Sequence, residues 1–306
     1  MKAPVWPLIW ALIWALSLGA AAPALGQSLP IRLEDGASWT FVARHDHEVD
    51  GAEARRFSVT TAKRLTWHGA ADGPGRIRME PISVTANAGL RPEAASAQTL
   101  DIPIEFDVDR SLAPNGVRNP AELRAATAAL FLRSGGSAEE MQRMTSEHPE
   151  VVDRTAMSLA GRELGLLARA QGVRFKSDLP IYDEDEVPNP LGGPPIRSRI
   201  TYALEAFDAA AGRAVVVWRA GVEPQAVRDS LMEAVGRLPA DRQPQAEARL
   251  ASVRLDDDRS CRNEIDIATG LALKVACVTK VTVVTGETTV VTTDRWTIDQ
   301  TLPGKP

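Results

Sequence analysis

The stretch CRNEIDIATGLALKVAC, Cys261–Cys277, contains both cysteines of the chain and the clearest signal for its fold. Two runs of alternating polarity flank the loop Ala268-Thr269-Gly270, and three-residue hairpin loops favour a glycine at the left-handed position that closes the turn. One face of the resulting hairpin is apolar and the other polar, as in a half-buried antiparallel pair of strands. The register set by this loop pairs Ile267 with Leu271, Ile265 with Leu273, Asn263 with Val275, Glu264 with Lys274 and Cys261 with Cys277.

Cross-strand pairing of the two cysteines predicts a structural disulfide. Directly paired residues have Cβ atoms about 4.5–5.5 Å apart, from which a modest local adjustment permits the bond. The facing charges of Glu264 and Lys274 favour the same register. The alternatives fit less well: a metal site needs further ligands and the nearest histidine is far away in sequence, while a reactive or redox thiol favours the C-x-x-C spacing that the chain lacks.

The N-terminal segment has the composition of a secretory signal peptide. Lys2 gives it a positive start, Leu8–Gly19 is an apolar run of the usual length, and Ala24-Leu25-Gly26 offers small residues before Gln27. The apolar run is shorter than the roughly 20 residues that span a bilayer. We therefore expect residues 1–26 to direct export and to be removed, with an uncleaved N-terminal anchor as the alternative. Export implies a periplasmic or secreted protein, in which a disulfide persists.

The composition is that of an ordinary globular chain. Its 306 residues are 44% hydrophobic and 25% charged, with a formal net charge of −5. An acidic balance lacks the basic footprint of nucleic-acid binding, so we expect no nucleic-acid partner. No later segment approaches the length of a membrane span. Residues 27–306 can form one α+β domain, or two subdomains at 27–110 (β-rich) and 111–306 (α+β). Richness in Ala and Arg favours a bacterial source.

Strand-like and helix-like segments alternate along residues 27–306. Gly286-Glu287 can form a two-residue hairpin loop, which would pair Cys277 with Trp296 and place this tryptophan beside the disulfide on the buried face. Hairpins rather than βαβ crossovers favour an α+β fold, with antiparallel meanders in a curved sheet packed against helices and a C-terminal three-stranded meander that holds the disulfide. Strands are expected at 38–49, 55–68, 76–86, 102–108, 177–182, 197–207 and 213–219, and helices at 120–133, 137–146, 149–170, 224–238 and 244–253.

His45-Asp46-His47 is the sharpest candidate for a metal site. Residues two apart on a strand point to the same face, so the imidazoles of His45 and His47 could both approach one metal ion. A third ligand would have to come from elsewhere, and His68 on the next strand is a candidate. The alternative is a hydrogen-bonded pair of histidines near a strand end, since no HExxH motif supports the metal.

Other polar clusters predict no defined chemistry. The acidic runs Asp183–Glu186 and Asp256–Asp258 lack the glycine and the distal glutamate of a calcium-binding loop, so we expect solvated loops, with loose calcium binding as the alternative. The chain has no G-x-S-x-G motif and no Gly-rich turn between a strand and a helix, so no catalytic residue is assigned and no cofactor is expected. His148 precedes a helix start without an evident partner.

These patterns favour an exported, non-enzymatic binding or carrier-like protein of the bacterial cell envelope. An apolar ligand or a protein partner would be bound, since the sheet is large and carries tryptophans. At the level of the fold alone, this design is similar to that of periplasmic lipoprotein carriers, in which a curved sheet cradles helices. Two alternatives stay open: an envelope hydrolase or metal-dependent enzyme that uses the His45/His47 region, and a structural or assembly component.

Overall fold

A computed structural model describes residues 27–51, 54–70, 73–86, 100–133, 135–147, 149–175, 179–187, 196–237, 239–251, 253–285 and 288–302. The predicted signal peptide at residues 1–26 lies outside this described part of the chain. The same is true of the predicted turn at Gly286-Glu287 and of His148.

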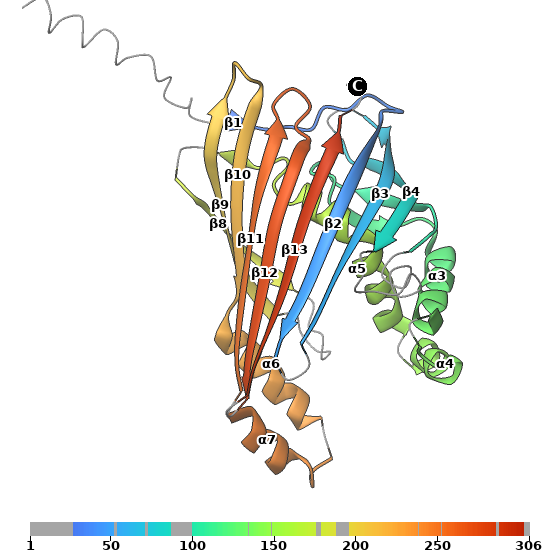
Figure 1. Cartoon of the computed structure of the whole chain (residues 1–306), viewed down its shortest axis with the longest axis vertical. Helices are drawn as coiled ribbons and strands as arrows, with labels where there is room; N and C mark the ends of the chain where they lie inside the picture. Colours follow the sequence, from blue (N-terminus) through green and yellow to red (C-terminus); the bar gives the residue numbers. More distant parts are fainter. Residues whose placement is uncertain are drawn as a thin grey trace, which may run out of the picture.

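Eleven strands form one antiparallel sheet in the described part of the chain (Figure 1). In spatial order they are β6 (Pro114–Val117), β5 (Ile104–Val108), β4 (Gly75–Ala86), β3 (Arg55–Gly69), β2 (Ser38–Asp50), β13 (Thr288–Thr301), β12 (Ala272–Thr285), β11 (Val253–Asp266), β10 (Arg213–Val222), β9 (Ile196–Asp208) and β8 (Ile181–Val187). The sheet is open, with β6 and β8 at its edges. A separate short pair is formed by β1 (Gln27–Ser28) and β7 (Arg174–Phe175).

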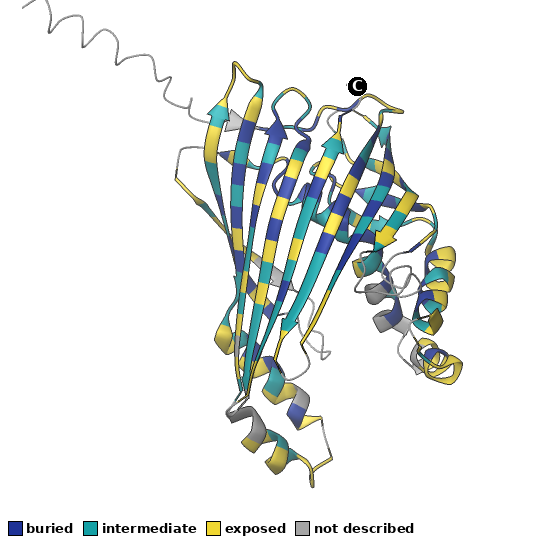
Figure 2. Cartoon of the chain, viewed as in Figure 1, coloured by how far each residue is buried: buried dark blue, intermediate teal, exposed yellow. Residues whose placement is uncertain are grey.

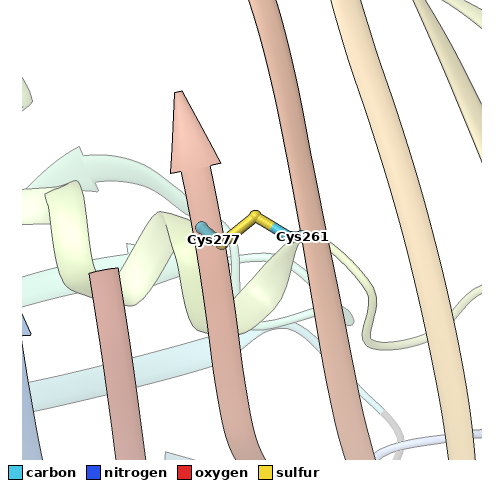
Figure 3. The surroundings of a disulfide bond; sticks show 2 residues. All are labelled: Cys261 and Cys277. Carbon is cyan, nitrogen blue, oxygen red and sulfur yellow. A yellow bond between two sulfur atoms is a disulfide. The ribbon is translucent and has the colours of Figure 1, made fainter. Parts of the chain in front are cut away.

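The predicted C-terminal meander is confirmed as β11–β12–β13. Cys261 lies opposite Cys277 in the ladder and forms the disulfide with it (Figure 3). Glu264 faces Lys274, and Cys277 in turn faces Trp296 of β13, and both pairings are as predicted. Local hairpin rules therefore predict the pairing of three adjacent strands and the disulfide between two of them.

The turn of the first hairpin is longer than predicted. The register shifts between Glu264 and Ile265, so that Ile265 faces Ala272 and not Leu273. The cause is Asp266, whose Oδ1 accepts the backbone N–H of Ala268 at 2.9 Å and holds the chain in a wider turn. Gly270 adopts the expected left-handed conformation, with φ of 72°.

Alternating burial gives the sheet two different faces (Figure 2). The inner face is the one on which Trp39, Phe41 and Ala43 of β2 are buried, as their alternation in the sequence predicts. Leu65 and Trp67 of β3 continue this buried face. The residues between them, Thr40, Val42 and Thr66, point to the outer face.

The pairing of β2 with β13 joins the two ends of the chain in one sheet. Trp296 lies opposite His45, and Asp294 lies opposite His47. Because Trp296 also faces Cys277, one inner-face row runs from the disulfide across β13 to the histidines of β2. This non-local pairing was not predicted from the sequence.

Five helices are described: α3 (Pro120–Arg133), α4 (Ala138–Glu147), α5 (Pro149–Ala168), α6 (Pro224–Gly236) and α7 (Gln243–Ala251). Each overlaps a predicted helix. The predicted capping box of α4 is confirmed, because Ser137 Oγ accepts the N–H of Glu140 at 3.1 Å and Glu140 Oε2 accepts the N–H of Ser137 at 3.1 Å. No helix in the described part of the chain combines the length and the apolarity needed to cross a bilayer.

Helix α5 contacts residues of two strands that lie far apart in the sheet. A Cβ on Gly161 would lie 3.3 Å from the side chain of Pro114 in β6. The guanidinium of the next residue, Arg162, lies 5.5 Å from the ring centre of Trp296 in β13. These strands are five places apart, or about 24 Å in a flat sheet at about 4.8 Å per strand. Neighbouring residues of one helix thus contact distant strands.

Both acidic runs predicted as loops are parts of strands. Residues 183–187 belong to the edge strand β8, where Glu184 faces Arg199 across the ladder. Negative charge on an edge strand discourages pairing with other chains, so such a run is compatible with strand structure. Asp256–Asp258 lies within β11, where Asp258 faces Lys280 and the nearly buried carboxylate of Asp257 pairs with Arg259 at 2.7 Å. Basic residues face two of these carboxylates across the ladder, and an arginine two places along the same strand pairs with a third, which composition alone does not reveal.

Candidate functional site

His45, His47 and Asp294 form a polar cluster on the inner face. The Nε2 atom of His45 lies 2.7 Å from Oδ1 of Asp294, and the Nδ1 atom of His47 lies 2.8 Å from the same oxygen. An ionised carboxylate only accepts hydrogen bonds, so both ring nitrogens donate to it. The two histidines are brought together by the alternation of β2, and the aspartate by the pairing of β2 with β13.

Aromatic rings fix the orientation of both imidazoles. The ring of His45 stacks on Trp296 with centres 4.0 Å apart and planes inclined by 7°. The ring of His47 stacks on Phe57 with centres 4.7 Å apart, and Phe57 also meets the edge of His45. Each imidazole is therefore held between a ring and the same carboxylate, which leaves little rotational freedom.

Asp294 is the acidic member of the cluster. Partial burial raises the pKa of this carboxyl group, but the hydrogen bonds from His45 and His47 outweigh that effect and bring the pKa below its ordinary value. Asp294 is therefore ionised at neutral pH, and the cluster offers two imidazole nitrogens and one carboxylate oxygen to a ligand.

A small cavity adjoins the cluster between α5 and the sheet. Its volume is about 20 Å³, which is room for about one water-sized group. His45 and Trp296 form part of the wall together with apolar side chains from β3, β5 and α5. The full lining is Ala43, His45, Val59, Thr61, Lys63, Leu100, Ile104, Leu159, Ala160, Arg162, Glu163 and Trp296.

A buried ion pair crosses the cavity wall from β3 to α5. Lys63 Nζ lies 3.1 Å from Glu163 Oε1, and the two side chains are 8% and 6% exposed. Two buried oxygens that line the same cavity, Oε2 of Glu163 and Oγ1 of Thr61, have no hydrogen-bond partner among the described residues. The wall near α5 is thus polar and incompletely satisfied, whereas the rest of the lining is largely apolar.

The sequence identified two members of the cluster and missed the third. His45 and His47 lie together on one face, as their spacing predicts, and whether they bind metal stays a prediction. His68 is not near them, because it points to the outer face of β3, where its Nδ1 lies 3.7 Å from Asp35 Oδ1. Asp294 could have been found only from the β2–β13 register, for which the sequence holds no local signal.

Comparisons with known proteins assign this chain to no family. No protein-family model matches the sequence, and no curated protein matches it. Among solved structures, lipovitellin, described for its lipid–protein interactions, is similar with a TM-score of 0.46 and 12% identity, over 89% of this chain and 26% of that one. This chain thus spans about a quarter of lipovitellin's length.

Two further structures are similar over more of their own length but with lower scores. DynF from the dynemicin biosynthesis pathway of Micromonospora chersina has a TM-score of 0.20 and 7% identity, with coverage of 93% of this chain and 88% of that one. Ail, the attachment invasion locus protein of Yersinia pestis, has a TM-score of 0.15 and 6% identity, with coverage of 88% and 100%. Likenesses at these scores establish neither family nor function.

Proposed function

We propose that this chain is an exported binding protein of the bacterial cell envelope that holds an apolar ligand on the inner face of its sheet. The observation that carries the proposal is an inner-face surface of half-buried apolar side chains, interspersed with Thr279, Thr292 and Asp294, between the core and one end of the strands. We call this surface the inner apolar band. Its members are Val49, Phe57, Val281, Val283, Val290 and Trp296, all of them half-buried.

The band and the core are parts of the same inner-face rows. Under α5, Val275 and Ile298 are fully buried. Further along the same two strands, Val283 and Val290 face each other across the ladder with intermediate exposure. Apolar side chains that face inward but keep part of their surface in water are the usual lining of a site for an apolar ligand.

Helix α5 and the sheet act as two walls in this proposal. The cavity between them, beside His45 and Trp296, is too small for a ligand chain. The ligand would therefore lie on the band and reach the cavity only if α5 moved away from the sheet. Each methylene group that leaves water contributes about 0.8 kcal/mol, so a chain of several carbons on this surface would bind measurably.

The disulfide supports export. A bond between Cys261 and Cys277 forms and persists in oxidising compartments and is rare in reducing ones. Residues 1–26 would supply the export signal. N-terminal sequencing of the protein recovered from cell envelopes or culture medium is expected to begin at Gln27, and a chain that keeps Met1 would contradict removal of the segment.

Binding of a dansyl-labelled fatty acid, followed by fluorescence, tests the ligand proposal. Val283 faces inward and Val284 faces outward on the same strand, so Val283→Asp and Val284→Asp form a matched pair. A carboxylate on an apolar contact surface costs more than about 1.4 kcal/mol, so Val283→Asp should weaken binding at least about tenfold. Val284→Asp should bind like the wild type. Equal affinities in two variants that melt at similar temperatures would refute the proposal.

Mass spectrometry of an organic extract from the protein purified from its own host would identify a retained ligand. The fluorescence comparison does not depend on that result, because it probes the surface with a ligand of known structure. A wild type that binds no labelled fatty acid at all would also contradict an apolar site.

A further inference from the structure

The geometry points to a metal site: we propose that His45, His47 and Asp294 together bind one divalent transition-metal ion, with Zn²⁺ as the best match. The three ligand atoms, one from each residue, lie within 4.8 Å of one another. This proposal is independent of apolar-ligand binding, since it concerns polar atoms at the inner end of the band.

The donor set suits zinc better than calcium or magnesium. Imidazole nitrogen and carboxylate oxygen are ordinary zinc ligands, whereas calcium and magnesium take oxygen ligands almost exclusively. Zinc sites with three protein ligands are typical where a fourth position is left for water or another small ligand. Nickel(II) and copper(II) accept the same donors, so they serve as probes of the site.

Only a small movement is needed to admit the ion. In a tetrahedral site with ligands about 2.0–2.1 Å from zinc, neighbouring ligand atoms lie about 3.3 Å apart. The two nitrogen–oxygen distances of the cluster are 2.7 and 2.8 Å. Each nitrogen must therefore move about 0.5 Å away from the carboxylate oxygen, and the two nitrogens, which lie within 4.8 Å of each other, must reach the same separation of about 3.3 Å. Side-chain rotations on paired strands supply both movements. The ion would replace the two N–H groups that now satisfy the carboxylate.

Neighbouring aromatic rings hold the ligand side chains in position before the ion binds. Trp296 stacks on His45, and Phe57 stacks on His47, so neither ring has to be ordered when the ion binds. The ligands come from β2 and β13, two paired strands inside the sheet and not loops. Ligands fixed beforehand lower the entropic cost of binding, which favours affinity.

Titration of zinc into tag-free protein, with a chromophoric chelator as competitor, tests the site. The wild type should bind one Zn²⁺ per chain. His47→Gln and Asp294→Asn each remove one ligand and should weaken binding more than about tenfold. His68→Gln is the matched control, because this histidine lies on the outer face. It should bind like the wild type. Absence of saturable binding by the wild type, or unchanged affinity in both ligand variants, would overturn the proposal.

Two spectroscopic measurements on the wild type test the metal site without depending on whether the ligand variants fold. Co²⁺ should give the intense visible absorption of a four-coordinate site, and weak bands of a hydrated six-coordinate ion would contradict it. Cu²⁺ should quench the fluorescence of Trp296, whose ring lies 4.0 Å from that of His45. Trp296→Phe should remove that quenching, and quenching that is unchanged in this variant would place the ion elsewhere.

Discussion

The buried ion pair between Lys63 and Glu163 gives the sharpest test of how α5 is held on the sheet. At 3.1 Å and an effective dielectric constant of about 20, the attraction between the charges is about 5 kcal/mol. Desolvation of two ions costs several kcal/mol each, so the net contribution of the pair is small. Removing one partner leaves the other charge buried and unpaired, which is far more costly than the loss of the pair.

Three variants separate these effects: Lys63→Met, Glu163→Leu and the double replacement. Each single variant should lose about 3–5 kcal/mol of unfolding free energy. At about 2–4 °C per kcal/mol, the melting temperature should fall by about 6–20 °C. The double variant should approach or exceed wild-type stability, because Glu163 Oε2 has no hydrogen-bond partner among the described residues and its desolvation is not compensated.

Urea unfolding followed by circular dichroism measures the coupling between the two positions. An exposed ion pair between α3 and α5, Arg124 with Asp153, is the control, and Asp153→Asn should cost less than about 1 kcal/mol. Additive losses in the double variant would refute the reasoning, since they would mean that the two charges do not compensate each other. Single variants that lose less than about 1 kcal/mol would refute the burial of the pair.

Three further outcomes follow from the structure. Gly270→Ala should cost about 1–3 kcal/mol in urea unfolding, because a Cβ there would lie 2.3 Å from the carbonyl oxygen of Pro30 at positive φ; Gly212→Ala, at positive φ in open space, should cost less. Serine in place of both cysteines should cost at most about 3 kcal/mol, since the closed loop is short and already local, and a loss well above about 3 kcal/mol would contradict this. With chelator present, the lowered pKa of Asp294 gives stability that is present above the ordinary carboxyl pKa of about 3.9 and lost as pH falls through the folded value. The difference in unfolding free energy between the wild type and Asp294→Asn should therefore shrink below about pH 4. A difference that grows below that pH would refute the direction of the pKa shift.

The sequence predicts those parts of the fold that depend on local rules. Turn residues and alternation are enough to pair Cys261 with Cys277 and Cys277 with Trp296, because each pairing needs one short loop. The error at the first turn arises where a side chain, that of Asp266, competes with the ladder for backbone N–H groups. The two acidic runs are predicted as loops, whereas they are strands in which basic residues face them across the ladder or pair with them along the same strand.

Long-range pairing limits what could be predicted of the candidate site. His45 and His47 share a face by strand alternation alone, so a pair of ligands follows from their spacing. Asp294 joins them only because β13 pairs with β2 across almost the whole length of the chain. No loop length relates the two strands, and a shift of one residue would have turned Asp294 to the outer face. The third ligand is thus a property of the register and not of a motif.

The disulfide and the cluster share this register without depending on each other. Cys277 faces Trp296, and Trp296 faces His45, so the bond lies two strands from the imidazoles in one inner-face row. The register of β13 is also fixed by its pairing with a strand on each side. A shift by one residue would expose its inward-facing apolar side chains. The bond therefore adds stability to a register that packing already selects. Apolar binding along the band and metal binding at its inner end are accordingly separable properties of one face, each with its own test.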